Sequence, residues 1–281
     1  MGNVVDYVRR EFRGFGELAF SNVDSLVLSE LSYMRLPGLV PAFGEAKSVA
    51  TVPIRELLRA ESYDGMFVSN SSEMNDYRLS LLRAVCESPR FRGLRGGEDD
   101  ERLDESEQQQ FAAMTFDLGA DFGLYVAFRG TDGTLVGWKE DFNMSFETEV
   151  PAQRDAVAYA QRVAAAIDLP LIVGGHSKGG NLAAYAGMFV DEATRARIQT
   201  VYNFDGPGFN EATISSEEFG KVDMRIRTFV PQSSMIGILM WHREPFTIVR
   251  SNGVGVFQHD AYTWQIMGGD FIKLSERTGH S

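Results

Sequence analysis

The sequence contains a single cysteine, Cys86, among its 281 residues. One thiol excludes an intramolecular disulfide and any zinc site built from paired cysteines. Cys86 shares the apolar face of a helical pattern with Leu82 and Val85, so we expect a buried structural thiol. The sequence also lacks an H-x-x-x-H pair, and His259 beside Asp260 is too little for a metal site. We therefore expect no metal ion and no cofactor.

No apolar run approaches the length of a membrane-spanning helix. Residues 1–10 also lack the apolar core and small-residue cleavage site of a secretory signal peptide. A strong basic patch is missing too, since the one candidate, Arg90 with Arg92 and Arg95, is short and the net charge is −12. A chain this acidic repels nucleic acid and anionic membrane surfaces. We expect a cytoplasmic protein with no nucleic-acid partner and no stable membrane insertion.

A chain of 281 residues with 44% hydrophobic content can bury one large core. Because α/β folds of this length commonly form one unit, we expect a single domain over residues 1–281. Within it, residues 1–108 should form a helical N-terminal region with an acidic loop. Residues 109–281 should form the core of the fold, which contains the sheet.

The N-terminal region is predicted to be mainly helical. Asp24 can cap a helix that ends before Pro37, and residues 51–53 can open a second, short helix with a proline in its first turn. A third helix is expected over Asn75–Glu87, because a proline follows it closely. The acidic run over residues 98–107 is most simply a solvated loop.

After the acidic run the apolar residues alternate, which predicts strands. Phe111–Leu118 and Leu124–Phe128, joined by a short Gly-Ala-Asp segment, indicate an antiparallel hairpin. Pro151–Ile167 predicts an Ala-rich helix opened by its proline. Four further strands are expected over Leu171–Val173, Val201–Phe204, Arg225–Val230 and Phe246–Val249. Strands that alternate with helices are typical of an α/β fold whose mostly parallel central sheet is covered by helices on both faces.

The turn after the strand at Leu171–Val173 is the most informative segment. Ser177 lies between Gly175 and Gly179 at G-x-S-x-G spacing, and an apolar helix is predicted over Asn181–Val190. A sharp strand-to-helix turn needs glycines, whose missing β-carbons avoid a clash, and it lifts the serine oxygen clear of the sheet. The alternative is a nucleotide-binding turn, but the segment has neither G-x-G-x-x-G order nor P-loop spacing. Ser177 is therefore the candidate nucleophile.

A serine hydroxyl needs a base within hydrogen-bond reach, and the sequence offers four histidines. His176 lies inside the turn, where its side chain should point away from the serine, and His280 lies in a terminal tail. His242 follows a predicted apolar helix, where a structural or exposed role fits equally well. His259 lies after the last predicted strand, which is where the base lies in hydrolases with the chain order Ser, acid, His. His259 is therefore the candidate base.

The acid that would orient His259 is the least defined member of the site. Asp205 ends the strand that follows the predicted helix Asn181–Val190. The next strand ends in residues 232–234, Gln-Ser-Ser, without a carboxylate. Asp205 is the best candidate, with Glu244 and Asp260 behind it. The alternative is that Asp205 only caps the Gly-Pro turn that follows it.

Donors for a developing oxyanion are expected at two places. The backbone N–H of Lys178 follows the serine directly, and a second donor should come from a loop after an early strand. Residues 128–132 form that loop, in which Thr131 offers a backbone N–H and a hydroxyl. Arg129 in the same loop is expected to be structural and paired with a nearby carboxylate.

Taken together, these segments resemble the class 3 lipase branch of the α/β hydrolases. The resemblance rests on Phe128–Thr131, Gly175–Ala183 and Gln258–Asp260, with further similarity at Val23–Tyr33 and Trp138–Phe142. It covers nearly the whole chain, which looks closest to a bacterial lipase-like family of mostly unknown function.

The resemblance implies an α/β-hydrolase domain in which Ser177 is the nucleophile and His259 the base. It also implies that Thr131 and Lys178 stabilise the oxyanion. The implied substrate is a carboxylic ester with an acyl or lipid-like group. Such folds also host esterases, thioesterases and relatives without catalytic activity, so the family alone does not define the substrate.

The chain departs from the lipase pattern at the acid. Class 3 lipases usually carry an aspartate in the loop matched here by residues 232–234, where this chain has none. Either Asp205 replaces it from the preceding strand, or the acid is weak or absent. Two functions follow: a serine hydrolase of lipase or esterase type, or a hydrolase-fold module that binds a ligand or regulates and has lost turnover.

The segment Ser234–Trp241 is apolar and rich in methionine, and it lies near where a lid or an acyl pocket could be. We prefer an ordinary core helix, since flexible methionine side chains also fill cores. The sequence leaves open the acyl length, the head group, a lid and the oligomeric state.

Overall fold

The structure, a computed structural model, describes residues 1–36, 38–43, 51–67, 69, 71–104, 109–131 and 149–277. Five features named above lie outside the described residues: Pro37, residues 105–107 of the acidic run, residue 132 of the predicted oxyanion loop, the segment Trp138–Phe142, and His280.

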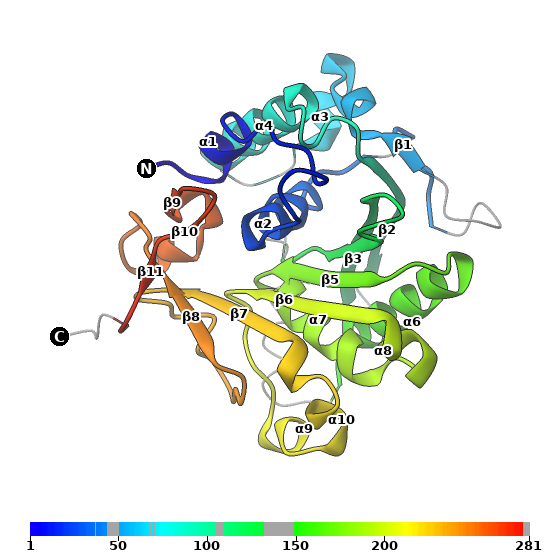
Figure 1. The fold of residues 1–281 in the computed structure, drawn as a ribbon. Coiled ribbons are helices and arrows are strands. Elements are labelled where there is room, and N and C mark those ends of the chain that lie inside the picture. Colours follow the sequence, from blue (N-terminus) through cyan, green and yellow to red (C-terminus); the bar gives the residue numbers. More distant parts are fainter. Residues whose placement is uncertain are drawn as a thin grey trace.

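Nine strands of the described residues form one sheet in the order β1-β2-β3-β4-β5-β6-β7-β8-β11 (Figure 1). Strands β4 to β8 pair in parallel and form its centre, while β1 to β3 and β11 pair antiparallel at its sides. The strands are β1 (Thr51–Pro53), β2 (Arg95–Asp104), β3 (Gln109–Asp117), β4 (Leu124–Phe128), β5 (Leu171–His176), β6 (Ile198–Phe204), β7 (Ile226–Pro231), β8 (Phe246–Val249) and β11 (Lys273–Leu274), with β9 (Ile266–Met267) and β10 (Asp270–Phe271) forming a separate pair. The predicted hairpin and mostly parallel sheet are confirmed.

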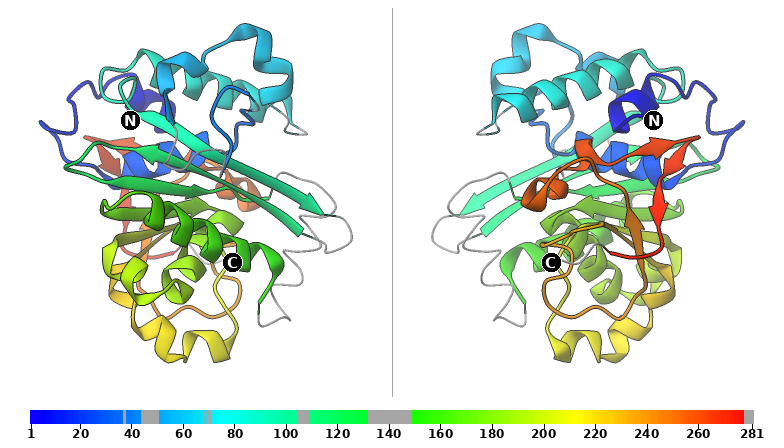
Figure 2. Two further views of the ribbon diagram at one scale, coloured as in Figure 1. Left: turned by 90° about the vertical axis from the view of Figure 1, so that its right-hand side faces the viewer. Right: turned by 90° about the vertical axis from the view of Figure 1, so that its left-hand side faces the viewer.

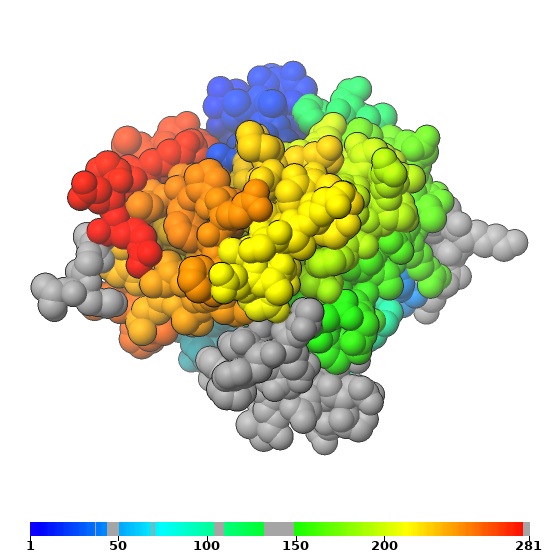
Figure 3. All heavy atoms as spheres, turned by 90° about the horizontal axis from the view of Figure 1, so that it is seen from below, coloured from blue at the N-terminus to red at the C-terminus, as the bar shows by residue number. Residues whose placement is uncertain are grey.

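Helices cover both faces of this sheet (Figures 1 and 2). Helices α1, α2 and α4 lie on one face, where α2 contacts β4 and β5, and α6, α7 and α8 lie on the other, where α7 contacts β4, β5 and β6. From below, the green helices α6 and α8, the yellow helices α9 and α10 and the orange segment around β8 share one surface (Figure 3). The α-helices are α1 (Val4–Val8), α2 (Asn22–Leu31), α3 (Tyr63–Met66), α4 (Ser72–Glu87), α6 (Pro151–Ala166), α7 (Lys178–Phe189), α8 (Glu192–Arg197), α9 (Glu211–Ile214) and α10 (Glu217–Gly220). Short 3-10 helices are η1 (Ile54–Leu57), η2 (Ala60–Ser62), η3 (Asp223–Arg225), η4 (Gly255–His259) and η5 (Ala261–Thr263).

Each face of the sheet has its own apolar core. One core joins the N-terminal helices to sheet residues such as Tyr125 and to Trp264 near the C-terminal end, both completely buried. The other packs α6 and α7 on the sheet, with Phe128 and Tyr159 buried between them. The N-terminal helices therefore pack on the same sheet whose strand β5 leads into the turn at Ser177.

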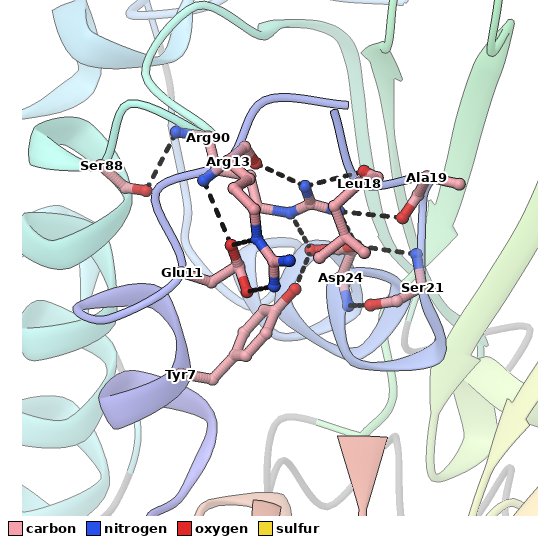
Figure 4. Close-up of polar contacts among 9 residues, drawn as sticks. All are labelled: Tyr7, Glu11, Arg13, Leu18, Ala19, Ser21, Asp24, Ser88 and Arg90. Carbon is pink, nitrogen blue, oxygen red and sulfur yellow. Dashed lines mark hydrogen bonds and ion pairs between the residues drawn. The ribbon is translucent and has the colours of Figure 1, made fainter. Parts of the chain in front are cut away.

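A buried ion pair fastens the N-terminal region to the segment after α4 (Figure 4). Arg90 donates to both carboxylate oxygens of Asp24, at 2.8 and 2.6 Å, and both side chains are fully buried. The guanidinium also donates to three backbone carbonyls in the segment Arg13–Ala19, and the Tyr7 hydroxyl donates to Asp24 at 2.8 Å. Arg90 is thus an internal anchor rather than part of a surface basic patch.

The first helical predictions need correction. The N-cap of α2 is Ser21 rather than Asp24, because the two residues form a capping box in which each side chain accepts from the other's backbone N–H. Residues 51–53 form edge strand β1, paired with β2, and a 3-10 helix begins only after Pro53. Helix α4 confirms the third predicted helix and buries Cys86 on its apolar face.

The described part of the acidic run is strand β2 rather than a solvated loop. Its backbone pairs antiparallel with β3, and a register shift between Gly97 and Asp100 accommodates Glu98, whose φ is 54°. Asp100 and Glu98 are buried. Arg102 binds both oxygens of Asp100 and reaches Asp155 at 2.8 Å, so arginine offsets part of the negative charge. The charged residues concealed the strand pattern in the sequence, and backbone pairing with β3 stabilises the strand.

The segment Ser234–Trp241 does not form a core helix. It is an irregular turn after β7 in which Met240 has a φ of 66°, a value that an α-helix does not contain. Met235, Leu239 and Trp241 are about half exposed. The segment therefore presents apolar side chains to solvent, and His242 does not follow a helix.

Candidate active site

The parallel strands bring the predicted site residues to one edge of the sheet. Arg129–Thr131 follows β4, Ser177 follows β5, Asp205 follows β6, and residues 232–234 follow β7. These strands are neighbours in the sheet and point the same way. Their carboxyl ends therefore lie side by side, at the edge where α/β folds usually bind ligands.

Ser177 occupies the strained turn that the sequence predicts. Its φ is 59° and it is the N-cap of α7, while its backbone N–H donates to the Phe204 carbonyl at 2.9 Å. A β-carbon on Gly179 would lie 2.1 Å from the Phe128 oxygen, and one on Gly175 would lie 2.4 Å from the Gly179 backbone. Both positions therefore require glycine, as expected for a nucleophile elbow.

His259 and Asp205 form a short polar contact beside the elbow, with Nδ1 of His259 2.6 Å from Oδ2 of Asp205. Asp205 is completely buried, whereas 25% of the His259 side chain is exposed. An ionised carboxylate can only accept, so Nδ1 carries the proton and Nε2 is left with its lone pair. This is the tautomer that a general base requires.

The two other candidate acids have different partners. Glu244 lies 2.9 Å from Nδ1 of His242 and accepts a hydrogen bond from the Thr228 hydroxyl at 2.7 Å. Asp260 accepts from the backbone N–H of Tyr262 at 2.9 Å and caps η5. Of the three carboxylates considered from the sequence, Asp205 is the one whose carboxylate contacts the His259 ring.

Ser234 binds the second oxygen of Asp205. Its buried hydroxyl donates to Oδ1 of Asp205 and accepts from the Gly237 N–H at 3.0 Å. A β-carbon on Gly237 would lie 2.2 Å from the same carboxylate oxygen. Sequence reasoning noted residues 232–234 only for their missing carboxylate. It missed Ser234 as a partner because Asp205 lies 29 residues earlier.

His176 links the His259 segment to the nucleophile strand. Its Nε2 lies 2.8 Å from the His259 carbonyl oxygen, and the two ring centroids are 4.7 Å apart. His259 is thereby held next to the residue that precedes Ser177. Among the hydrogen bonds of the described residues, none joins the Ser177 hydroxyl to the His259 ring.

The two predicted oxyanion donors flank Ser177. Lys178 is the first residue of α7, so its backbone N–H lies at a helix N-terminus, where negative charge is stabilised. Its buried ammonium group donates to the Gln110 carbonyl at 2.9 Å. On the other side, a β-carbon on Gly130 would lie 3.0 Å from the Ser177 β-carbon, so the loop that continues into Thr131 passes directly against the serine.

Arg129 has the structural role predicted for it. Its buried guanidinium donates to the Ser32 carbonyl at 2.6 Å and pairs with Glu101 at 3.2 Å. These contacts join the loop after β4 to the end of α2 and to β2. Arg129 thus attaches the loop that carries Thr131 to both α2 and β2.

The described residues offer neither a metal site nor a membrane-spanning helix. In the part of the chain that the structure describes, no three His, Cys, Asp or Glu side chains gather in a way that could hold a metal ion. Within the same residues, no helix combines the length and the apolar character needed to cross a membrane.

The parallel sheet, its two helical layers and the strand-turn-helix at Ser177 define a lipase-like α/β-hydrolase fold. Within that class, the chain belongs to the Mbeg1-like family, whose family model matches residues 85–281. No curated protein matches the sequence.

Solved lipases are similar in structure at low sequence identity. M37 lipase has 12% identity and a TM-score of 0.49, over 78% of this chain and 70% of that chain. A lipase from Rhizopus microsporus var. chinensis has 15% identity and a TM-score of 0.42, over 78% and 85% of the two chains. The Rhizomucor miehei lipase propeptide complex has 15% identity and a TM-score of 0.43, over 84% and 88%.

Proposed function

We propose that the protein is a serine hydrolase that cleaves carboxylic esters through an acyl-enzyme on Ser177. The observation that carries the proposal is the 2.6 Å contact between Asp205 and Nδ1 of His259, beside a serine in an elbow conformation. A buried carboxylate and a strained serine at adjacent strand ends, with a partly exposed imidazole from η4, are the parts of a catalytic triad.

In the first half of the reaction, Oγ of Ser177 attacks the ester carbonyl carbon while Nε2 of His259 takes the hydroxyl proton. Asp205 stabilises the imidazolium that results. The backbone N–H of Lys178, with Thr131, stabilises the negative charge that develops on the carbonyl oxygen. His259 then gives its proton to the departing alkoxide, and the acyl group stays on Ser177.

In the second half, a water molecule attacks the acyl carbon while Nε2 of His259 removes a proton from it. The second tetrahedral intermediate uses the same oxyanion donors. Collapse of this intermediate returns the proton to Ser177 and releases the carboxylic acid, so the enzyme ends in its starting state.

Exposed apolar side chains around the pair of Asp205 and His259 support an acyl or lipid-like substrate. Trp241, 56% exposed, lies in the turn after β7 whose Ser234 binds Asp205, and Phe257, 73% exposed, lies two residues before His259. Isolated exposed apolar residues are normal, whereas apolar residues in segments that carry site residues are a feature of surfaces that bind apolar ligands.

Labelling with a fluorophosphonate probe tests the proposal, because the probe reacts with activated serines without requiring the natural substrate. We expect labelling of the wild type, none of Ser177→Ala and little of His259→Ala. His242→Gln is the matched control, since that histidine contacts Glu244 instead of Asp205 and labelling should persist. A folded wild type without labelling would contradict the proposal and favour a ligand-binding module, in line with the missing hydrogen bond between Ser177 and His259.

A further inference from the structure

A buried polar cluster lies beneath the elbow, and the proposed chemistry does not use it. Glu30 in the last turn of α2, Tyr33 just after that helix, and His176 of β5 are all more than nine-tenths buried. Oε1 of Glu30 lies 3.2 Å from Nδ1 of His176. The Tyr33 hydroxyl lies 3.3 Å from the same nitrogen and donates to the His176 carbonyl at 3.2 Å. The far side of the ring meets the His259 carbonyl at 2.8 Å.

The partners of His176 determine where its ring proton lies. A carbonyl oxygen only accepts, so Nε2 must carry a proton and donate it to the His259 carbonyl. Burial lowers the pKa of His176 well below its usual range, so the ring is neutral and Nδ1 holds a lone pair. Tyr33 has one hydroxyl proton, and its oxygen lies 3.2 Å from the His176 carbonyl and 3.3 Å from Nδ1. When that proton goes to the carbonyl, Nδ1 needs another donor, and Glu30 lies within reach.

Glu30 has the properties of that donor. Burial raises its pKa to about 8, the Arg78 guanidinium of α4 opposes this, Asp260 reinforces it, and Tyr262 of η5 opposes it weakly. The C-terminal end of a helix also disfavours a negative charge. Among the described residues, no group donates a hydrogen bond to Oε1 of Glu30. The Tyr262 hydroxyl hydrogen-bonds to the same carboxyl group. Oε1 lies 3.2 Å from Nδ1, so a proton on this oxygen can be donated to the nitrogen lone pair.

We infer that Glu30 is a positioning residue: its neutral carboxyl donates to Nδ1 of His176 and fixes the tautomer whose Nε2–H holds the His259 segment against the nucleophile strand. The catalytic consequence of this inference rests on the proposed function, whereas the hydrogen-bond order does not. Glu30 precedes residues 85–281, so a residue outside the segment matched by the family model supports the site.

The inference predicts a change at alkaline pH. Once Glu30 ionises, a carboxylate faces the lone pair on Nδ1, and the two repel each other. Moving the ring proton of His176 to Nδ1 removes that repulsion, but it also removes the donor that Nε2 offers to the His259 carbonyl. His259 is then less firmly placed, and the rate of attack by Ser177 falls.

Nitrogen-15 NMR of the histidine rings tests the hydrogen-bond order without any substrate. In the wild type at pH 7 we expect His176 to be neutral and protonated at Nε2, with a shift toward Nδ1 protonation above pH 8. Glu30→Gln should keep the Nε2–H form at both pH values, because an amide N–H can replace the carboxyl donor and does not ionise. Tyr33→Phe is the matched control, which removes the other neighbour of Nδ1 and should keep the wild-type titration.

Rates then test the catalytic part. We expect wild-type kcat to fall about tenfold above pH 8 with KM nearly unchanged, the effect of losing one buried hydrogen bond, and Glu30→Gln to lack this fall. His176 protonated at Nδ1 in the wild type at pH 7, or the same alkaline tautomer shift and rate loss in Glu30→Gln, would overturn the inference. A wild type without turnover or labelling would instead contradict the proposed function, and the NMR result would still decide the inference.

Discussion

Replacing Glu30 with glutamine should change how the free energy of unfolding depends on pH. Burial raises the pKa of Glu30 from 4.5 to about 8 in the folded protein. A group that binds its proton more tightly when folded stabilises the fold below its unfolded pKa, and that stability is lost as the pH rises through the folded pKa. The interval is about 3.5 pH units, which at 1.36 kcal/mol each is about 5 kcal/mol.

Urea unfolding followed by circular dichroism measures this term, provided that each transition is cooperative. The wild type and Glu30→Gln are compared at several values between pH 4.5 and 9, and the difference between their unfolding free energies is plotted against pH. The wild type should lose about 5 kcal/mol relative to the variant over this range, with most of the slope between pH 5 and 8. Glu61→Gln, at an exposed position, controls for the loss of one negative charge.

A difference that stays constant to within about 1 kcal/mol from pH 4.5 to 9 would refute a raised pKa for Glu30. Glu30 would then be ionised in the folded protein at neutral pH, and it could not donate to His176. A slope of opposite sign would mean that Arg78 outweighs burial, since the guanidinium is the main group that favours the ionised form.

Three further predictions concern the candidate triad and the N-terminal anchor. Asp205→Asn should lower kcat of ester hydrolysis by about 10⁴, because an amide no longer enforces the required His259 tautomer, while Asp260→Asn should have a far smaller effect. Ser234→Ala should lower kcat by about tenfold to a hundredfold with KM little changed, since it removes a buried donor to a charged acceptor worth about 1.5 to 3 kcal/mol, and an unaltered kcat would contradict a positioning role. Arg90→Met should lower the unfolding free energy by about 3 to 5 kcal/mol, because it leaves a buried carboxylate unpaired. Arg95→Met is the control for an exposed guanidinium and should cost about 1 kcal/mol or less by urea unfolding.

Local patterns in the sequence predict most of the fold between β3 and β8. Alternating apolar residues identified β3 and β4, and short apolar runs identified the parallel strands to within three residues at each end. Strand β2 was not predicted because its residues are mostly charged. It exists because β3 supplies the backbone partners and Arg102 offsets the charge of Asp100, and neither effect is visible in a local window.

Some residues of the candidate site could likewise be predicted from the sequence, and others could not. Ser177 and Lys178 belong to one short motif, and chain order alone selected His259 and Asp205. The contacts of Ser234 and Glu30 depend on partners that approach only when strands and helices pack together. No spacing rule in the sequence links Glu30 to the elbow, and a glutamate in an amphipathic helix is ordinarily a solvated residue.

The missing aspartate in the loop after β7 has a structural explanation. Asp205 follows β6 with a φ of 51°, a left-handed conformation that aspartate tolerates better than most residues, and its N–H donates to the Phe229 carbonyl of β7. Its carboxylate therefore lies against the turn after β7, where the Ser234 hydroxyl donates to it. A second carboxylate at Ser234 would repel Asp205 at hydrogen-bonding distance and raise the pKa of the pair. A hydroxyl instead donates to Asp205, so a serine at that position complements the carboxylate that we propose as the acid.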